Sequence, residues 1–174
     1  MFLETLLVNL QNLSEMEDIL GLINELSTNY SVDPNLVKAI CRKESNWISW
    51  RTRYEEAWKY FYFPLKYSQK LGITFKSESN LQATSFGFMQ VMGAVARELG
   101  FDDYLTKLSL PDIGLLFGVK KLAQLHTTHD DIRDVISAYN AGTPTKLAGK
   151  YVNEDYVVDV MNNYSLYKAN PNVY

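Results

Sequence analysis

VKAICRKESNW, residues 37–47, is the segment from which the organisation of the chain can be worked out. Upstream of it, Asp33 and Pro34 indicate a helix start, because Asp caps free backbone N–H groups and Pro is tolerated in the first turn. Apolar residues then recur at helical spacing, which predicts one buried helix face: Leu36, Val37, Ile40 and Cys41. One turn later the same face reaches Glu44. Since burying an unpaired carboxylate is costly, Glu44 either reaches solvent at the helix end or is held in an apolar cleft for a purpose.

Apolar periodicity predicts helices on the N-terminal side of this segment. We expect two of them, over residues 2–13 and 15–26, with Ser14 and Glu17 spaced as a capping box. A polar connection over residues 27–32 would follow. The two helices are expected to pack on the main body of the protein.

The middle of the chain has little periodicity. Residues 50–55 favour a short strand or an extended loop, and residues 57–71 are dense in aromatic side chains, with Pro64 interrupting any helix there. Residues 70–82 are predicted to be an exposed excursion.

Helical periodicity returns in the last half of the chain, with Pro, Asp and Gly at the boundaries. The predicted helices run from Phe88 to a stop at Gly100, from Pro111 towards Leu125, from a cap at Asp130 or Asp131 to Gly142, and onward from Asn153. The sequence therefore predicts a single, mainly α-helical domain over residues 1–174, with a small irregular or β-hairpin segment near residues 48–84.

The composition is that of a soluble globular protein, with 47% hydrophobic and 21% charged residues among 174. The net charge of −3 gives no reason to expect attraction to nucleic acid or to an anionic membrane. Twelve Tyr, eight Phe and three Trp exceed what a core of this size needs. Rings of this kind often line sites that are apolar on one side and wet on the other, such as sugar-binding grooves.

Metal, cofactor and membrane chemistry find little support in the sequence. Cys41 is the only cysteine and lies on the apolar helix face, which is typical of a buried hydrophobe. His126 and His129 are the only histidines, and nothing else resembles a ligand set. We therefore predict no metal and no other cofactor. No apolar run approaches the length of a membrane span, so no membrane insertion is expected.

Three short motifs follow one another, each at a predicted helix boundary: Glu44-Ser45, then GFMQ at residues 87–90, then AYNAG at residues 138–142. In this order they resemble the soluble lytic transglycosylase (SLT) family and its goose-type lysozyme relatives, over about residues 33–167. The resemblance implies a lysozyme-like helical fold. It also implies an enzyme that acts on peptidoglycan glycan strands, at the β-1,4 bond between N-acetylmuramic acid and N-acetylglucosamine.

The resemblance further implies that Glu44 is the catalytic acid that protonates the glycosidic oxygen. An apolar surrounding would raise the pKa of its carboxyl and keep it protonated. Tyr139 is expected near Glu44, positioning it or the substrate through its hydroxyl, with Asn140 in support. The complete set of expected substrate-binding residues is Ser45, Glu55, Met89, Gln90, Tyr139 and Asn140. Glu55 is included because RYE, residues 53–55, resembles a segment of some phage-type members.

Three functions remain open. In a lytic transglycosylase Glu44 acts first as acid and then as base on the C6 hydroxyl of muramic acid, which gives a 1,6-anhydro product. A hydrolytic muramidase would use two carboxyl groups, with Glu55 or Glu56 as the second. A non-catalytic glycan-binding domain is the third possibility. We favour the transglycosylase because the resemblance implies a single glutamate.

The N-terminal region does not resemble a secretory signal. Residues 1–30 carry five acidic side chains and no Lys or Arg, whereas such a signal begins with a basic region. We therefore expect synthesis in the cytoplasm and action on the bacterial cell wall after phage lysis or delivery by a virion. We expect a monomer whose partner is peptidoglycan.

Overall fold

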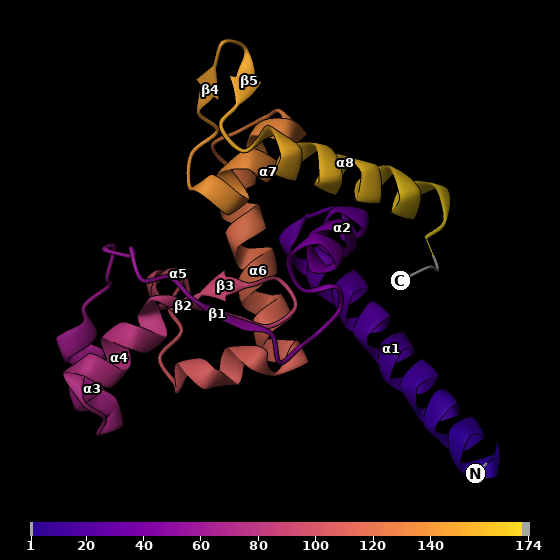
Figure 1. Cartoon of the computed structure of the whole chain (residues 1–174), viewed down its shortest axis with the longest axis horizontal. Helices are drawn as coiled ribbons and strands as arrows, with labels where there is room; N and C mark the ends of the chain where they lie inside the picture. The colour runs from indigo at the N-terminus through magenta and orange to yellow at the C-terminus, as the bar shows by residue number, and fades with distance from the viewer. Residues whose placement is uncertain (1, 172–174) are drawn as a thin grey trace.

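The computed structural model describes residues 2–171, with side chains from residue 15 onward, as a mainly helical chain with two small antiparallel sheets (Figure 1). This confirms the predicted fold class. The helices are α1 (Phe2–Tyr30), α2 (Pro34–Ser45), α3 (Pro64–Leu71), α4 (Phe75–Gln82), α5 (Gly93–Glu98), the 3-10 helix η1 (Leu105–Ser109), α6 (Pro111–His126), α7 (Ile132–Ala141) and α8 (Glu154–Ala169). The strands are β1 (Thr52–Tyr54), β2 (Thr84–Phe86), β3 (Val91–Met92), β4 (Lys146–Leu147) and β5 (Lys150–Tyr151).

Helix α2 lies at the centre of the molecule and packs along α8 and against α1 (Figure 1). Its start is as predicted, because Asp33 Oδ1 accepts the Asn35 N–H at 2.8 Å and Pro34 occupies the first turn. The predicted apolar face is fully buried: Leu36, Val37, Ile40 and Cys41. Burial of this face anchors the last turn of α2 in the fold, where Ser45 is buried and Glu44 is half-buried.

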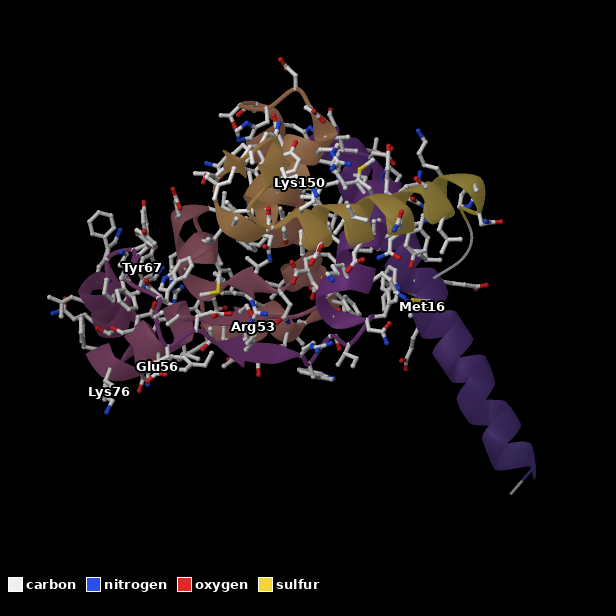
Figure 2. The ribbon with its side chains drawn as sticks, turned by 45° about the horizontal axis from the view of Figure 1, so that its top comes forward. Met16, Arg53, Glu56, Tyr67, Lys76 and Lys150 are labelled. Atoms are coloured by element: carbon white, nitrogen blue, oxygen red, sulfur yellow. The ribbon has the colours of Figure 1, made fainter. Side chains whose placement is uncertain are left out.

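Helix α1 is one continuous helix to Tyr30, so the prediction of two helices and a polar connection was wrong. Ser14 lies within it. Ser lowers helix stability by only about 0.5 kcal/mol relative to Ala, so it does not end a helix as Pro does. Ile23 is fully buried where α1 packs against α6 and α2. On the N-terminal side of Met16, the helix extends away from the body of the protein (Figure 2).

The middle of the chain forms a three-stranded sheet in the order β1-β2-β3. Of the two structures predicted for residues 50–55, a short strand or an extended loop, the strand forms as β1. Arg53 pairs with Ser85, which in turn pairs with Met92. The helix predicted from Phe88 starts only at Gly93, because residues 87–90 form a tight turn before β3.

Backbone geometry explains the delayed start of α5. Gly87 has φ of +76°, and a Cβ there would lie 2.5 Å from the Leu108 carbonyl oxygen. Gln90 also has a positive φ, of 47°. These conformations belong to a turn and not to a right-handed helix, which apolar spacing alone does not reveal.

Residues 70–82 were predicted to be an exposed excursion. Most of them are exposed, but the segment is part of two packed helices and carries two buried side chains. Helices α3 and α4 pack against each other, and Thr74 caps α4 by accepting the Ser77 N–H at 3.0 Å. Glu78 and Gln82 on α4 are fully buried. Polar residues are usually exposed, but here Arg97 of α5 pairs with Glu78, a contact that sequence periodicity does not report.

The C-terminal half largely follows the prediction. Helix α6 starts at Pro111, α7 is capped by Asp131 and ends at Gly142, and α8 starts after Asn153. Helix α6 packs against α1, α7, β3 and η1, so it joins the sheet-containing half to the half formed by α1, α2, α7 and α8 (Figure 1).

Candidate active site

A cleft of about 300 Å³ is lined by side chains from the end of α2, the three-stranded sheet, α6 and α7. It brings together five of the seven side chains predicted to form a site: Glu44, Glu55, Gln90, Tyr139 and Asn140. The other lining residues are Arg53, Ala57, Trp58, Tyr60, Ser85, Met92 and Lys121. Arg53 is labelled near the middle of Figure 2, below α8.

Glu44 is placed by the way α2 ends. The Asn46 N–H bonds the Arg42 carbonyl at 3.1 Å, and both Asn46 and Trp47 have positive φ, so the chain turns away at once. The Trp47 ring then packs edge-on against Phe88, with centroids 6.0 Å apart. These contacts hold the last turn of α2 beside the cleft.

The Glu44 carboxyl experiences opposing influences. Burial raises its pKa above the ordinary value, because desolvation disfavours the charged form. The Tyr156 hydroxyl donates to Glu44 Oε1 at 2.7 Å and lowers the pKa, as do the charges of Lys121 and Arg53. The net direction is upward. A carboxyl in this state is suited to give up a proton and to take one back.

Lys121 of α6 also lines the cleft with Glu44, although the sequence did not indicate it as a site residue. Its Nζ donates to the Tyr139 carbonyl at 2.6 Å and lies 4.2 Å from the centre of the Tyr139 ring. Desolvation lowers the pKa of Lys121 to about 8, against the raising effect of Glu44. The site therefore contains an ammonium group that titrates close to neutral pH.

Tyr139 lines the cleft, but its hydroxyl does not contact Glu44 as expected. It donates instead to the Met89 carbonyl at 2.8 Å, which ties α7 to the turn of residues 87–90. The tyrosine that bonds Glu44 is Tyr156 of α8. Tyr139 does lie near Glu44 as expected, but not through its hydroxyl. Both tyrosines lie on buried helix faces, and only the crossing of α8 over α2 decides which hydroxyl reaches the carboxyl.

Met89 and Ser45 are not brought into the cleft. Met89 is fully buried and packs against Gly118, where a Cβ would lie 2.2 Å from the Met89 sulfur. Ser45 is also fully buried, and its Oγ donates to the Cys41 carbonyl at 3.1 Å. Both side chains support the elements that carry the site, Ser45 within α2 and Met89 under α6.

Gln90 and Asn140 line the cleft while holding neighbouring backbone or side chains. Gln90 Nε2 donates to the Arg51 and Gly87 carbonyls at 2.8 and 2.9 Å, and Oε1 accepts the Ser85 hydroxyl at 2.9 Å. Asn140 Oδ1 accepts from Asn153 Nδ2 at 3.0 Å. Asn153, which the sequence pattern indicates only as a helix start, therefore positions the end of α7.

Glu55 lies in the same cleft as Glu44, paired with Arg53 through Nε–Oε1 at 2.5 Å. Its backbone N–H also bonds the Ala83 carbonyl at 2.8 Å, which fixes the end of β1. Glu56 is exposed and does not line the cleft. Of the two adjacent glutamates, Glu55 is thus the one available to a ligand in the cleft.

One side of the cleft is formed by residues of the segment 57–62, which we call the aromatic wall. Trp58 and Tyr60 line the cleft, and Tyr60 is 68% exposed. The Trp58 indole N–H donates to the Tyr60 carbonyl at 2.9 Å, and the two rings meet edge-on with centroids 5.7 Å apart. Exposed rings fixed in this way present flat apolar surface to a ligand.

Within residues 2–171, no group of His, Cys, Asp and Glu side chains is arranged to hold a metal ion. In the same described part of the chain, none of the helices combines the length and apolarity that a membrane crossing needs. The site is accordingly described by its carboxyl, ammonium, hydroxyl, amide and aromatic groups.

A weak signal for the missed residues is present in the sequence. Tyr156 falls on the apolar stripe of the last helix, and a buried tyrosine hydroxyl normally finds a partner. Lys121 is a charged residue within the otherwise apolar pattern of α6, and a lysine in such a place also needs a partner. Neither signal names the partner, because Glu44 is far away in the sequence.

A family model described as "Transglycosylase SLT domain" matches residues 21–156. No curated protein sequence matches the chain at a significant level. Among solved structures, an inactive mutant of the lytic transglycosylase Slt from Pseudomonas aeruginosa is similar, with a TM-score of 0.59 and 18% identity over 87% of this chain. The match covers 24% of that enzyme, so the chain spans about a quarter of its length. At this identity the structural likeness shows the fold, and it agrees with the lysozyme-like fold expected from the three motifs.

Proposed function

Since the chain belongs to the transglycosylase SLT domain family, we propose that it is a lytic transglycosylase acting on peptidoglycan. The bond cleaved is the β-1,4 bond between N-acetylmuramic acid and N-acetylglucosamine. The observation that carries the proposal is the Glu44 carboxyl, held by Tyr156 in a cleft walled by aromatic rings and raised in pKa by burial. The similar solved enzyme is inactive when a glutamate is replaced by glutamine, which supports an essential glutamate in that protein.

In the first step Glu44 gives its proton to the glycosidic oxygen. The bond between that oxygen and C1 of the muramic residue breaks, and the N-acetylglucosamine part leaves with a free 4-hydroxyl. We assign the proton to Oε2, because Oε1 accepts the Tyr156 hydroxyl. The 2-acetamido group of the muramic residue supports the electron-poor C1.

In the second step the Glu44 carboxylate takes the proton of the muramic C6 hydroxyl. The C6 oxygen attacks C1 and closes the 1,6-anhydro ring, so Glu44 regains its proton and no water is consumed. The attack is intramolecular and has the advantage of proximity over water. Tyr156 and Lys121 favour the carboxylate that forms between the steps, while burial favours the acid that begins the first.

A hydrolytic muramidase is the second candidate, favoured by one observation: Glu55 lines the same cleft as Glu44. Hydrolysis by two carboxyl groups would need Glu55 to activate water or to attack C1. Its ion pair with Arg53 fixes the position of the side chain, which is compatible with either of those roles and with simple positioning of the substrate.

Product analysis separates the two candidates. Purified peptidoglycan is digested, and the muramic ends are identified by mass spectrometry. Ends that lack one water, as 1,6-anhydromuramic acid does, are expected. Reducing muramic ends, together with loss of activity in Glu55→Gln, would instead support the muramidase.

The Glu44→Gln variant tests the enzyme against a binding domain. The glutamine retains an oxygen to accept the Tyr156 hydroxyl, so the fold should be kept. Loss of a general acid is expected to lower the cleavage rate by a factor on the order of 10²–10⁴. Binding of the glycan should persist. Unchanged turnover in this variant would contradict the assignment of Glu44.

A further inference from the structure

The aromatic wall belongs to no helix or strand, although three of its residues, Ala57, Trp58 and Tyr60, line the cleft. One side chain behind it bonds both backbone groups of a wall residue. Gln82 Oε1 accepts the Tyr62 N–H at 2.7 Å, and Gln82 Nε2 donates to the Tyr62 carbonyl at 3.0 Å. Such a paired bond mimics a strand contact and fixes both position and orientation of the segment.

Gln82 is itself fixed by a buried ion pair. Its Nε2 donates to Glu78 Oε1 at 2.9 Å, and Arg97 meets both Glu78 oxygens, Nε–Oε1 at 2.8 Å and a second nitrogen to Oε2 at 3.0 Å. The side chains of Gln82, Glu78 and Arg97 are all 0% exposed. The contacts therefore run without interruption from α5 through α4 to the wall.

The far end of this network is equally well bonded. The remaining Arg97 nitrogen donates to the carbonyls of Phe101 and Asp103 at 2.9 and 2.7 Å, and the guanidinium lies 4.3 Å from the centre of the Tyr67 ring. A buried ion pair adds little stability over an apolar replacement. A fully bonded one does restrict its neighbours to a single arrangement. The neighbour restricted here is the aromatic wall.

We propose that Gln82 is a positioning residue for glycan binding. Fixed by Glu78 and Arg97, it holds the aromatic wall at the spacing from Glu44 that a sugar ring requires. The inference rests on the proposed function, because it takes the ligand of the cleft to be a glycan. Gln82 does not line the cleft, so it acts through the wall and not on the reacting atoms.

The test compares wild type with Gln82→Met, which keeps the side-chain volume and removes the bonds to Tyr62 and Glu78. Losing the two bonds to Tyr62 is expected to speed hydrogen exchange of the Tyr62 amide, and to raise KM for peptide-free glycan strands, by about tenfold each. The rate constant kcat should change less than about twofold. The pH at which activity falls on the alkaline side should stay unchanged, since Glu44 keeps its neighbours.

Thr74→Ala is the matched control. It removes the cap of the same helix, α4, and leaves the contacts of Tyr62 in place. Its melting temperature should fall, while KM and exchange of the Tyr62 amide stay at wild-type values. A KM that rises equally in both variants would overturn the proposal, as would a fall in kcat at constant KM in Gln82→Met.

A measurement on the wild-type protein remains decisive if Gln82→Met does not fold. The Tyr62 amide should exchange more slowly than that of Lys59 in the same irregular segment, and equal rates would overturn the proposal. Hydrogen exchange and glycan affinity need no turnover. A protein that binds glycan with the expected Gln82 dependence but forms no product would contradict the proposed reaction and leave the positioning role supported.

Discussion

Glu44 is the residue on which the proposed chemistry depends, and its surroundings act on it in two directions. Burial at the end of α2 raises its pKa, and the Tyr156 hydroxyl together with nearby cations lowers it. A carboxyl that must be an acid in one step and a base in the next cannot be held strongly in either form. The Tyr156 hydroxyl, which bonds Oε1, and the charged Lys121 side chain are therefore the two groups to substitute.

Tyr156→Phe removes the hydroxyl that donates to Glu44 Oε1 at 2.7 Å. That hydrogen bond favours the carboxylate, so its loss should raise the pKa of Glu44 further. Because the first step needs protonated Glu44, activity is lost as pH rises through this pKa. We expect the alkaline limb of the pH–rate profile to move to higher pH. Tyr164 lies on the same helix as Tyr156, and its hydroxyl donates to Asp33. The control variant Tyr164→Phe should therefore leave the alkaline limb in place.

Lys121→Met removes a positive charge that lowers the pKa of Glu44. The alkaline limb should again move to higher pH. With a pKa of about 8, Lys121 is charged below that pH and exerts its effect on Glu44 there. Lys120→Met is the control, because Lys120 lies over the Phe117 ring and does not line the cleft. A profile identical to wild type in Lys121→Met would show that its charge does not reach Glu44.

At the scale of elements, the site is formed where secondary structure ends. Glu44 lies in the last turn of α2, Gln90 in the turn before β3, and Asn140 near the end of α7. The ends of helices and strands, and the turns between them, expose side chains that the interior of a regular helix or sheet would bury. The aromatic wall is the extreme case, since it lies outside every helix and strand and is held by its own Trp58–Tyr60 contacts and by Gln82 of α4.

Tyr60→Ala tests whether the aromatic wall binds sugar. The Tyr60 ring is 68% exposed, so its loss should change the melting temperature little. If stacking on a sugar is worth about as much as an aromatic pair, about 0.5–1.5 kcal/mol, the glycan affinity should fall about two- to twelvefold. Phe75→Ala, which removes a ring 55% exposed and outside the cleft, is the control. Equal affinity in both variants would show that the wall does not contact the ligand.

At the scale of the molecule, two halves meet along the cleft and α6 joins them. The half formed by α1, α2, α7 and α8 has an apolar core and supplies Glu44 and Tyr156. The sheet-containing half carries the buried pair Glu78–Arg97 beside its apolar contacts. The geometry of the cleft therefore depends on an apolar core shared by both halves and, in the sheet-containing half, on a buried polar network as well.

Arg97→Met should destabilise the whole protein, because it leaves Glu78 buried without its partner. Breaking a buried pair typically costs about 3–5 kcal/mol, which is about 6–20 °C in melting temperature for a chain of this size. Adding Glu78→Leu should recover much of the loss, since no unpaired charge then remains. Lys107→Met, which breaks the exposed pair with Asp103, is the control and should shift the melting temperature far less. A double variant as unstable as the single one would contradict this account.

The amino-acid sequence by itself determined the central helix, its cap at Asp33, its buried face and the helices after Pro111. The sequence also indicates Glu44 as the candidate acid, through the conflict between an apolar face and a carboxylate and through three motifs in order. These features are local, because capping, periodicity and turn residues act over a few positions along the chain. A single sequence is therefore sufficient to predict them.

Which distant groups meet depends on how the helices and strands pack, and short-range patterns do not report it. Tyr156 rather than Tyr139 bonds Glu44 because α8 packs along α2, and Glu78 is buried because Arg97 lies across from it. Met89 was placed in the core by the close approach of Gly118. Partners of this kind are set by the packing of whole elements, and a polar residue alone in sequence gives no indication of a partner many residues away.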